Sequence, residues 1–295
     1  MRVGLFIGTQ KLDDFVAEVR KAADLGFTSA WAPEIFGLDP LSALAVAGRE
    51  VPGIEFGTGV VPIYPRHPMS LAMSALTTQA ATGGRLSLGI GLSHQVVVEN
   101  MWGYSFDKPA RRMEEYLSAL LPLLRDKAVT FEGETVKAMG QLQTGDVPAP
   151  SVLLAALAPR MLSLAGTLTD GTVTWMTGPK TVGGHVVPRL TEAADKAGRP
   201  PPRVVVALPT AVTDEVDAAR ERAANAFVIY GGLPSYRTML DREGAEGPAD
   251  VAIVGDEAAV RGQIEEVFAQ GATEFVLVPF AERERTLATV AEMVK

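Results

Sequence analysis

Short apolar runs alternate with longer segments of helical periodicity along the whole chain. Eight of these runs are apolar on both faces, which predicts parallel strands covered by helices. They bear Val, Ile, Leu and Thr and stand next to Gly or Pro. The predicted strands are Val3–Ile7, Thr28–Ala32, Glu55–Val61, Leu86–Ile90, Ser151–Ala156, Thr172–Trp175, Val204–Leu208 and Glu274–Val278.

The segments between these runs predict amphipathic helices. In the first, Phe15, Val19 and Ala23 share one face, and Gly26 follows where such a helix is expected to end. Asp214 is the expected N-cap of a later helix. The other predicted helices are Pro40–Gly48, Pro68–Ala81, a long helix from Pro109, Arg160–Leu168, Thr191–Ala197, Asp214–Ile229, Ser235–Glu243, Glu257–Ala269 and Arg283–Val294.

Eight strand–helix units in 295 residues predict a TIM barrel, an α/β fold, as a single domain over residues 1–295. A doubly wound sheet is the alternative. The stretch from Val129 to Pro150 has weak periodicity and several glycines, so we expect a small hairpin outside the core.

The composition narrows the classes of partner. The formal net charge of −8 and the lack of a basic tract argue against nucleic acid. No apolar run approaches the roughly 18–20 residues that span a bilayer, and the N-terminal MRVGLFIGTQK predicts a strand rather than a signal peptide. We therefore expect a soluble cytoplasmic protein.

Cysteine and histidine usage narrows the chemistry. There is no cysteine, which excludes disulfides and thiolate catalysis. The three histidines, His67, His94 and His185, show no metal-ligand spacing, so we expect no metal site.

In a TIM barrel the active site lies at the C-terminal ends of the strands. Many residues expected there are small or apolar, which suits a flat ring better than a metal ion or a bare anion. These residues are Gly8, Glu34, Gly59, Val60, Gly91, His94, Ala156, Leu157, Met176, Thr177, Pro209 and Phe280.

Four motifs give the chain a family resemblance. They are GTGVVPIYPRHP (Gly57 to Pro68), GGRLSLGIGLSH (Gly83 to His94), LLAALAPRMLSLAG (Leu153 to Gly166) and TDGTVTWMTGP (Thr169 to Pro179). Through these motifs the chain resembles the bacterial luciferase-like superfamily. Within that superfamily it resembles the branch that uses the deazaflavin coenzyme F420. FMN is the alternative cofactor.

The resemblance implies a cofactor ring held across the strand ends. A non-proline cis peptide at Gly59–Val60 would back the ring, and the loops Ala158–Arg160 and Thr177–Pro179 would hold the phosphate-bearing tail. The residues it implies as cofactor contacts are Thr58, Gly59, Val60, His67, Gly91, Leu92, Ala155, Ala156, Leu157, Arg160, Met176, Thr177 and Gly178.

A deazaflavin of this branch transfers hydride through ring carbon five, and the protein orients it and excludes water. A group that holds a proton near the substrate is then needed. His94 is the first candidate and Glu34 the second, with His67 third. Each also has a structural interpretation, because His94 could bond a turn, Glu34 could pair with an arginine and His67 could serve the helix that follows it.

Three functions stay open. The first is an F420-dependent oxidoreductase that moves hydride to or from a small organic substrate. The second is a luciferase-like monooxygenase that uses reduced FMN and O2, and the third is a barrel that binds flavin without catalysis. The resemblance also implies a homodimer, with Leu71, Met73 and Leu76 serving either that contact or the core. Tyr230, Tyr236 and Arg237 are candidates for the mouth of the site.

Overall fold

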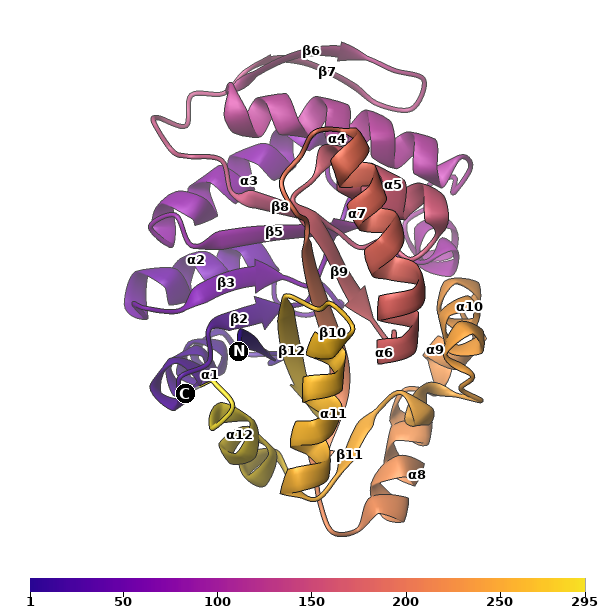
Figure 1. The fold of residues 1–295 in the computed structure, drawn as a ribbon. Coiled ribbons are helices and arrows are strands. Elements are labelled where there is room, and N and C mark those ends of the chain that lie inside the picture. Colours follow the sequence, from indigo (N-terminus) through magenta and orange to yellow (C-terminus); the bar gives the residue numbers. More distant parts are fainter. Residues whose placement is uncertain (295) are drawn as a thin grey trace. The chain divides into compact units, whose positions relative to one another are not determined.

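The computed structural model describes residues 1–294 (Figure 1). Hydrogen-bonded strands follow the order β12-β1-β2-β3-β5-β8-β9-β10, and β10 pairs with β12, so the parallel sheet closes on itself. This confirms the predicted TIM barrel. The eight strands are β1 (Val3–Phe6), β2 (Ser29–Ala32), β3 (Glu55–Thr58), β5 (Leu86–Gly91), β8 (Ser151–Leu154), β9 (Gly171–Trp175), β10 (Arg203–Val212) and β12 (Glu274–Pro279).

The predicted helices are present, and two of them match at both ends. These are α3 (Pro68–Ala81) and α11 (Glu257–Ala269). Proline at the first turn and a capping side chain define where such helices begin. The other helices are α1 (Leu12–Leu25), α2 (Pro40–Glu50), α4 (Pro109–Arg125), α5 (Pro159–Leu168), α6 (Pro179–Thr181), α7 (Val187–Lys196), α8 (Val216–Ala226), α9 (Val228–Gly232), α10 (Pro234–Glu243) and α12 (Arg283–Ala291).

Some elements have no counterpart in the prediction. Two short strands, β4 (Val61–Pro62) and β11 (Ile253–Gly255), pair with β5 and with the far end of β10. A π-helical segment, Val182–Val186, joins α6 to α7. It contains Gly183 and Gly184, whose low helix propensity conceals the helix in the sequence.

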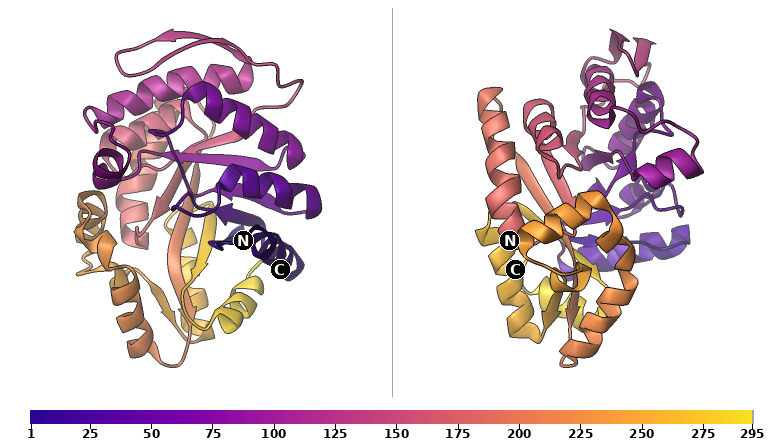
Figure 2. Two further views of the ribbon diagram at one scale, coloured as in Figure 1. Left: turned by 180° about the vertical axis from the view of Figure 1, so that it is seen from behind. Right: turned by 90° about the vertical axis from the view of Figure 1, so that its right-hand side faces the viewer.

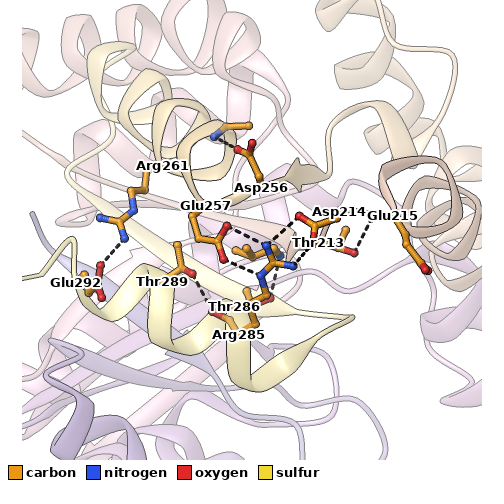
Figure 3. A network of polar contacts seen from close by, with 12 residues as sticks. Thr213, Asp214, Glu215, Asp256, Glu257, Arg261, Arg285, Thr286, Thr289 and Glu292 are labelled. Carbon is orange, nitrogen blue, oxygen red and sulfur yellow. Dashed lines mark hydrogen bonds and ion pairs between the residues drawn. The ribbon is translucent and has the colours of Figure 1, made fainter.

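The prediction for Asp214 is wrong. Helix α8 begins at Val216, and no side chain caps it. The Asp214 carboxylate instead accepts two 3.0 Å hydrogen bonds from Arg285, which also pairs with Glu257 (Figure 3). Arg285 on α12 thus ties together the loops that follow β10 and β11, a long-range pairing that helix-capping rules cannot foresee.

The chain divides into two compact units. Unit 1 comprises Met1–Ile7, Lys21–Trp31 and Ala156–Lys295, and unit 2 comprises Gly8–Arg20 and Ala32–Ala155. Each unit carries the carboxyl ends of several barrel strands. The expected single domain stays a prediction.

Within unit 2, the expected hairpin is formed by β6 (Ala128–Glu132) and β7 (Lys137–Gln141), which pair antiparallel. It lies along α4 (Figures 1 and 2). The buried carboxylate of Glu115 on α4 accepts from the main-chain N–H groups of Glu134, Thr135 and Val136. This single side chain therefore anchors the hairpin turn.

Within unit 1, the buried carboxylate of Glu274 accepts hydrogen bonds from Ser29 Oγ, Trp31 Nε1 and Arg203 Nη2. Glu274 and Arg203 are the first residues of β12 and β10. A network at this end of the strands lies away from the end where TIM-barrel chemistry occurs, so it stabilises the fold.

No helix within residues 1–294 has the length and apolar character needed to cross a bilayer.

Candidate active site at the strand ends

In unit 2, the ends of β3 and β5 are locked together. Thr58 Oγ1 donates to the Gly89 carbonyl at 2.7 Å and accepts from the Gly89 N–H at 2.8 Å. A Cβ on Gly89 would lie 2.1 Å from the Thr58 carbonyl oxygen, so only glycine permits this approach. Thr58 is fully buried, and its hydroxyl is committed to this contact.

The peptide bond Gly59–Val60 is cis, as the resemblance implies. Val60 then stands beside Gly91 at the end of β5. A Cβ on Gly91 would lie 2.7 Å from Val60 Cγ2 and 3.3 Å from Ala155 Cβ. Val60, Leu92 and Ala155 are partly exposed. The strand ends thus present main chain and small aliphatic groups, a surface that fits the face of a flat ring.

Glu34 follows β2 and pairs with Arg66, confirming the structural interpretation of its sequence position. Arg66 Nη2 donates to Glu34 Oε2 at 3.0 Å and also bonds Asp39 Oδ2. Burial raises the pKa of Glu34, and the opposing charge and hydrogen bond of Arg66 limit that rise. Burial acts against ionisation of Asp39 too, yet its hydrogen bonds from Ser42 and Arg66 hold its pKa below the usual value.

His94 lies three residues beyond the end of β5 and is partly buried. Its carbonyl accepts from the N–H groups of Val97 and Val98, which starts the helical turn that follows. Burial lowers the pKa of His94, so the ring is neutral at pH 7. A neutral imidazole at a strand end can hold or accept a proton.

His67 has a structural role at the start of α3. Its Nδ1 accepts from the Met69 N–H at 3.2 Å, and its Nε2 lies 2.9 Å from the Lys137 carbonyl on β7. Because Nδ1 accepts, Nε2 carries the proton and donates. Both ring nitrogens are engaged, which favours anchoring of the hairpin over acid–base chemistry.

In unit 1, the loop after β8 is fixed by a residue that the sequence does not single out. His185 is buried, and its Nε2 lies 2.7 Å from the Leu157 carbonyl. Ala156 is buried and Leu157 partly exposed, and Arg160 is exposed in the first turn of α5. A lone histidine after two glycines gives no local signal for such a contact.

The loop after β9 is closed by an acidic residue from far along the chain. Met176 and Thr177 are fully buried, with Met176 at a φ of 52°. The Glu243 carboxylate accepts from the N–H groups of Lys180 at 3.1 Å and Thr181 at 2.7 Å. Both donors lie in α6, directly after the loop Thr177–Pro179 that is predicted to hold the phosphate-bearing tail.

Aromatic rings gather beside this loop in unit 1. Trp175 ends β9 and makes edge-to-face contacts with Phe227 and Tyr230, each with ring centroids 5.8 Å apart. Tyr230 contacts Tyr236 at 5.2 Å, and Phe227 contacts Phe280 at 5.8 Å. We call these five residues the aromatic cluster. All five are partly exposed. The sequence points to Tyr230 and Tyr236 but gives no sign that Phe227 joins them.

The chain matches the model of the luciferase-like monooxygenase family over residues 1–278. It belongs to this family. The match confirms the resemblance read from the four motifs.

Among its relatives is a 5,10-methylenetetrahydromethanopterin reductase from Methanolobus tindarius. It is 31% identical over 252 residues, which cover 83% of this chain and 75% of the reductase.

Solved structures share the luciferase-like fold. A coenzyme F420-dependent tetrahydromethanopterin reductase from Methanopyrus kandleri superposes with a TM-score of 0.81, at 23% identity, over 99% of this chain and 97% of the other. The FMN-bound oxygenating constituent of 3,6-diketocamphane monooxygenase from Pseudomonas putida superposes with a TM-score of 0.79, at 17% identity. The superposition covers 100% of this chain and 97% of the other. At these identities the likeness shows the fold alone.

Within residues 1–294 of this luciferase-like chain, no group of three or more His, Asp or Glu side chains could hold a metal ion.

Proposed function

We propose that this luciferase-like chain is a coenzyme F420-dependent oxidoreductase that transfers hydride between F420 and a small organic substrate. The observation that carries the proposal is its 31% identity to a methylenetetrahydromethanopterin reductase over most of both chains. A solved reductase that acts on the same class of pterin depends on F420 and has the same fold.

The surface at the end of β5 fits the ring of this cofactor. A Cβ at Gly91 would fill space against Val60 and Ala155, so the glycine keeps that surface low and flat. When bound, F420 would supply the hydride through its ring carbon five. Thr58, Met176 and Thr177 are fully buried, so we propose that they support this surface from beneath. The residues proposed to contact the cofactor are Gly59, Val60, His67, Gly91, Leu92, Ala155, Ala156, Leu157, Arg160 and Gly178.

His94 is the proposed group that moves the proton. Burial keeps it neutral at pH 7, so it can accept a proton from a substrate hydroxyl when substrate is oxidised. Glu34 is the second candidate. Arg66, which also bonds Asp39, fixes the Glu34 carboxylate, so its proposed role is to orient substrate or to receive a proton from it.

FMN-dependent monooxygenation is the second candidate, because an FMN-bound monooxygenase shares the fold. Fluorescence titration separates the two cofactors. The purified protein is titrated with oxidised F420, reduced F420 and FMN. We expect saturable F420 binding and at least tenfold weaker FMN binding. Tight FMN binding without F420 binding would reverse the assignment.

A single variant separates an enzyme from a barrel that only binds cofactor. His94→Gln should keep F420 affinity and reduce turnover about 100-fold, within the range typical of a lost acid–base group. Gln95→Ala is the control, because this neighbouring side chain is exposed to solvent and bonds Glu99. Wild-type protein that binds F420 but turns over no substrate in a panel of alcohols, ketones and unsaturated carbonyl compounds would support the binding barrel.

We also propose a cytoplasmic homodimer that pairs through α2 and α3. Leu71 and Leu76 are fully buried in the core, whereas Met73 on α3 and Val46 on α2 are exposed by 47% and 37%. Met73→Lys should therefore shift sedimentation from dimer to monomer without changing the fold. A wild type that sediments as a monomer would contradict the dimer.

A further inference from the structure

Phe36, in the loop after β2, combines two features that disfavour the folded state. Phe36 is exposed by 67%, and the neighbouring Ile35 by 61%. The main chain of Phe36 has a φ of 51°, in the left-handed region that bulky side chains rarely adopt. An apolar ring left in water gains no burial that would offset this strain. Strained residues that persist in a fold cluster at functional sites, so Phe36 is a candidate for contact with a ligand.

One guanidinium fixes both ends of the loop that carries Phe36. Arg66 Nη2 bonds Glu34 Oε2 at 3.0 Å on one side of Phe36, and it bonds Asp39 Oδ2 on the other. Asp39 is also the N-cap of α2, where its Oδ1 accepts from the Ser42 N–H at 2.8 Å. The residues between Glu34 and Asp39 therefore form a short arch with fixed ends, on which Phe36 is held exposed.

This arch lies at the strand ends of unit 2 to which the chemistry is assigned. The Gly59 N–H donates to the Ala32 carbonyl at 2.9 Å, so the end of β3 adjoins the end of β2. Strand β5 pairs with β3 on its other side. Neighbouring strands lie about 4.8 Å apart, so the ends of β2 and β5 are separated by roughly 10 Å. A small organic molecule that reaches His94 beyond β5 can therefore also meet Phe36 beyond β2.

We propose that Phe36 is a specificity-determining residue that contacts the apolar part of the substrate. The inference rests on the proposed function, because it names the substrate class of that reaction as small organic molecules with a hydrocarbon portion. Contact with the ring removes apolar surface of both partners from water, which strengthens binding. A substrate without a hydrocarbon portion gains nothing from Phe36.

Two ketones that differ only in chain length test this proposal. NMR titrations measure the binding of 2-butanone and 2-octanone to the full chain, with and without oxidised F420. We expect wild type to bind 2-octanone at least tenfold more tightly than 2-butanone, and Phe36→Asn to reduce that ratio about fivefold. Phe36→Leu, which keeps an apolar side chain, should retain most of the ratio.

The asparagine variant also separates a ligand contact from a role in the fold. Asparagine adopts positive φ more readily than phenylalanine, so Phe36→Asn should melt at the same temperature as wild type or higher. Met139→Ala is the matched control, because Met139 is exposed by 60% on the hairpin strand β7 of the same unit. It should leave the ratio of the two ketones unchanged.

Several results would overturn the inference. They are binding of neither ketone to wild type, an unchanged ratio in Phe36→Asn, or a lower melting temperature of that variant. Weaker F420 binding by Phe36→Asn would assign the ring to the cofactor, and a loss of dimer in sedimentation would assign it to a contact between copies. F420 binding with an unchanged ratio refutes only the inference, whereas a reduced ratio without F420 binding refutes only the proposed cofactor.

Discussion

Arg66 Nη2 lies 3.0 Å from Glu34 Oε2, and this pairing limits the rise in pKa that burial causes in a candidate catalytic carboxyl. Burial of Glu34 favours its neutral form, and Arg66 opposes that effect. The same guanidinium nitrogen bonds Asp39. The loops after β2 and β4 are thereby fixed to each other within unit 2.

Removing this guanidinium should raise the pKa of Glu34 further. Arg66→Met eliminates the opposite charge, so we expect an upward shift of about one unit or more in an NMR titration. Arg20→Met is the control, because it breaks a 3.2 Å ion pair with Glu50 on the exposed surface of the same unit. A Glu34 pKa that does not move would show that Arg66 does not govern it.

The pKa of Glu34 also predicts a sign for stability. A carboxyl whose folded pKa is raised stabilises the fold at pH values below its unfolded pKa, 4.5, and loses that contribution as the pH rises through the folded pKa. Glu34→Gln should therefore be more stable relative to wild type at pH 7 than at pH 4, which means that its free energy of unfolding minus that of wild type is larger at pH 7. Urea denaturation at both pH values measures the difference.

The pKa of His94 predicts the acidic limb of the activity profile. Burial lowers this pKa below the ordinary 6.5, so the neutral ring should persist to lower pH. In the direction in which His94 accepts a proton, kcat/KM should fall only below pH 6.5. In His94→Gln, most of the activity should be lost, and the remaining kcat/KM should no longer fall below pH 6.5. A wild-type limb above pH 7 would assign it to another group.

Gly91 tests the surface proposed for the cofactor ring. Gly91→Ala should weaken F420 binding about tenfold or more, because its Cβ would lie 2.7 Å from Val60 Cγ2 and displace that side chain. Adding Val60→Ala should recover part of the affinity by removing the collision. If the single and double variants bind F420 as wild type does, the ring lies elsewhere.

Glu115 should be a major anchor of the β6–β7 hairpin. Hydrogen bonds from Arg111, Thr135 and Glu134 outweigh its burial and lower its pKa to about 2. The resulting stabilisation, roughly 3 kcal/mol, is present above pH 4.5 and is lost as the pH falls toward 2. Glu115→Gln should lower the free energy of unfolding at pH 7 by a similar amount.

Limited proteolysis checks where the effect of Glu115→Gln arises, since cleavage should concentrate in the hairpin turn. Glu114→Gln, on the exposed side of the same helix, is the control and should unfold as wild type does. Equal stability of Glu115→Gln and wild type at pH 7 would contradict the anchoring role.

The sequence by itself determined the alternation of eight strands with helices, the hairpin after α4 and the family. These features are carried by local patterns: two-faced apolar runs, helical periodicity, and proline or glycine where elements begin or end. Helices α3 and α11 match their predicted bounds for this reason. The small residues at the strand ends, such as Gly91, could be predicted from the sequence in the same way.

Only the tertiary structure decided which side chains meet. Glu243 bonds an N–H 62 positions away, His185 bonds a carbonyl 28 away, and Arg285 reaches Asp214 across 71. No local pattern encodes such pairs, because each depends on which strand end a loop reaches after the barrel closes. Asp214 carries a good capping signal, yet two hydrogen bonds from a guanidinium outcompete one from a helix N-terminus.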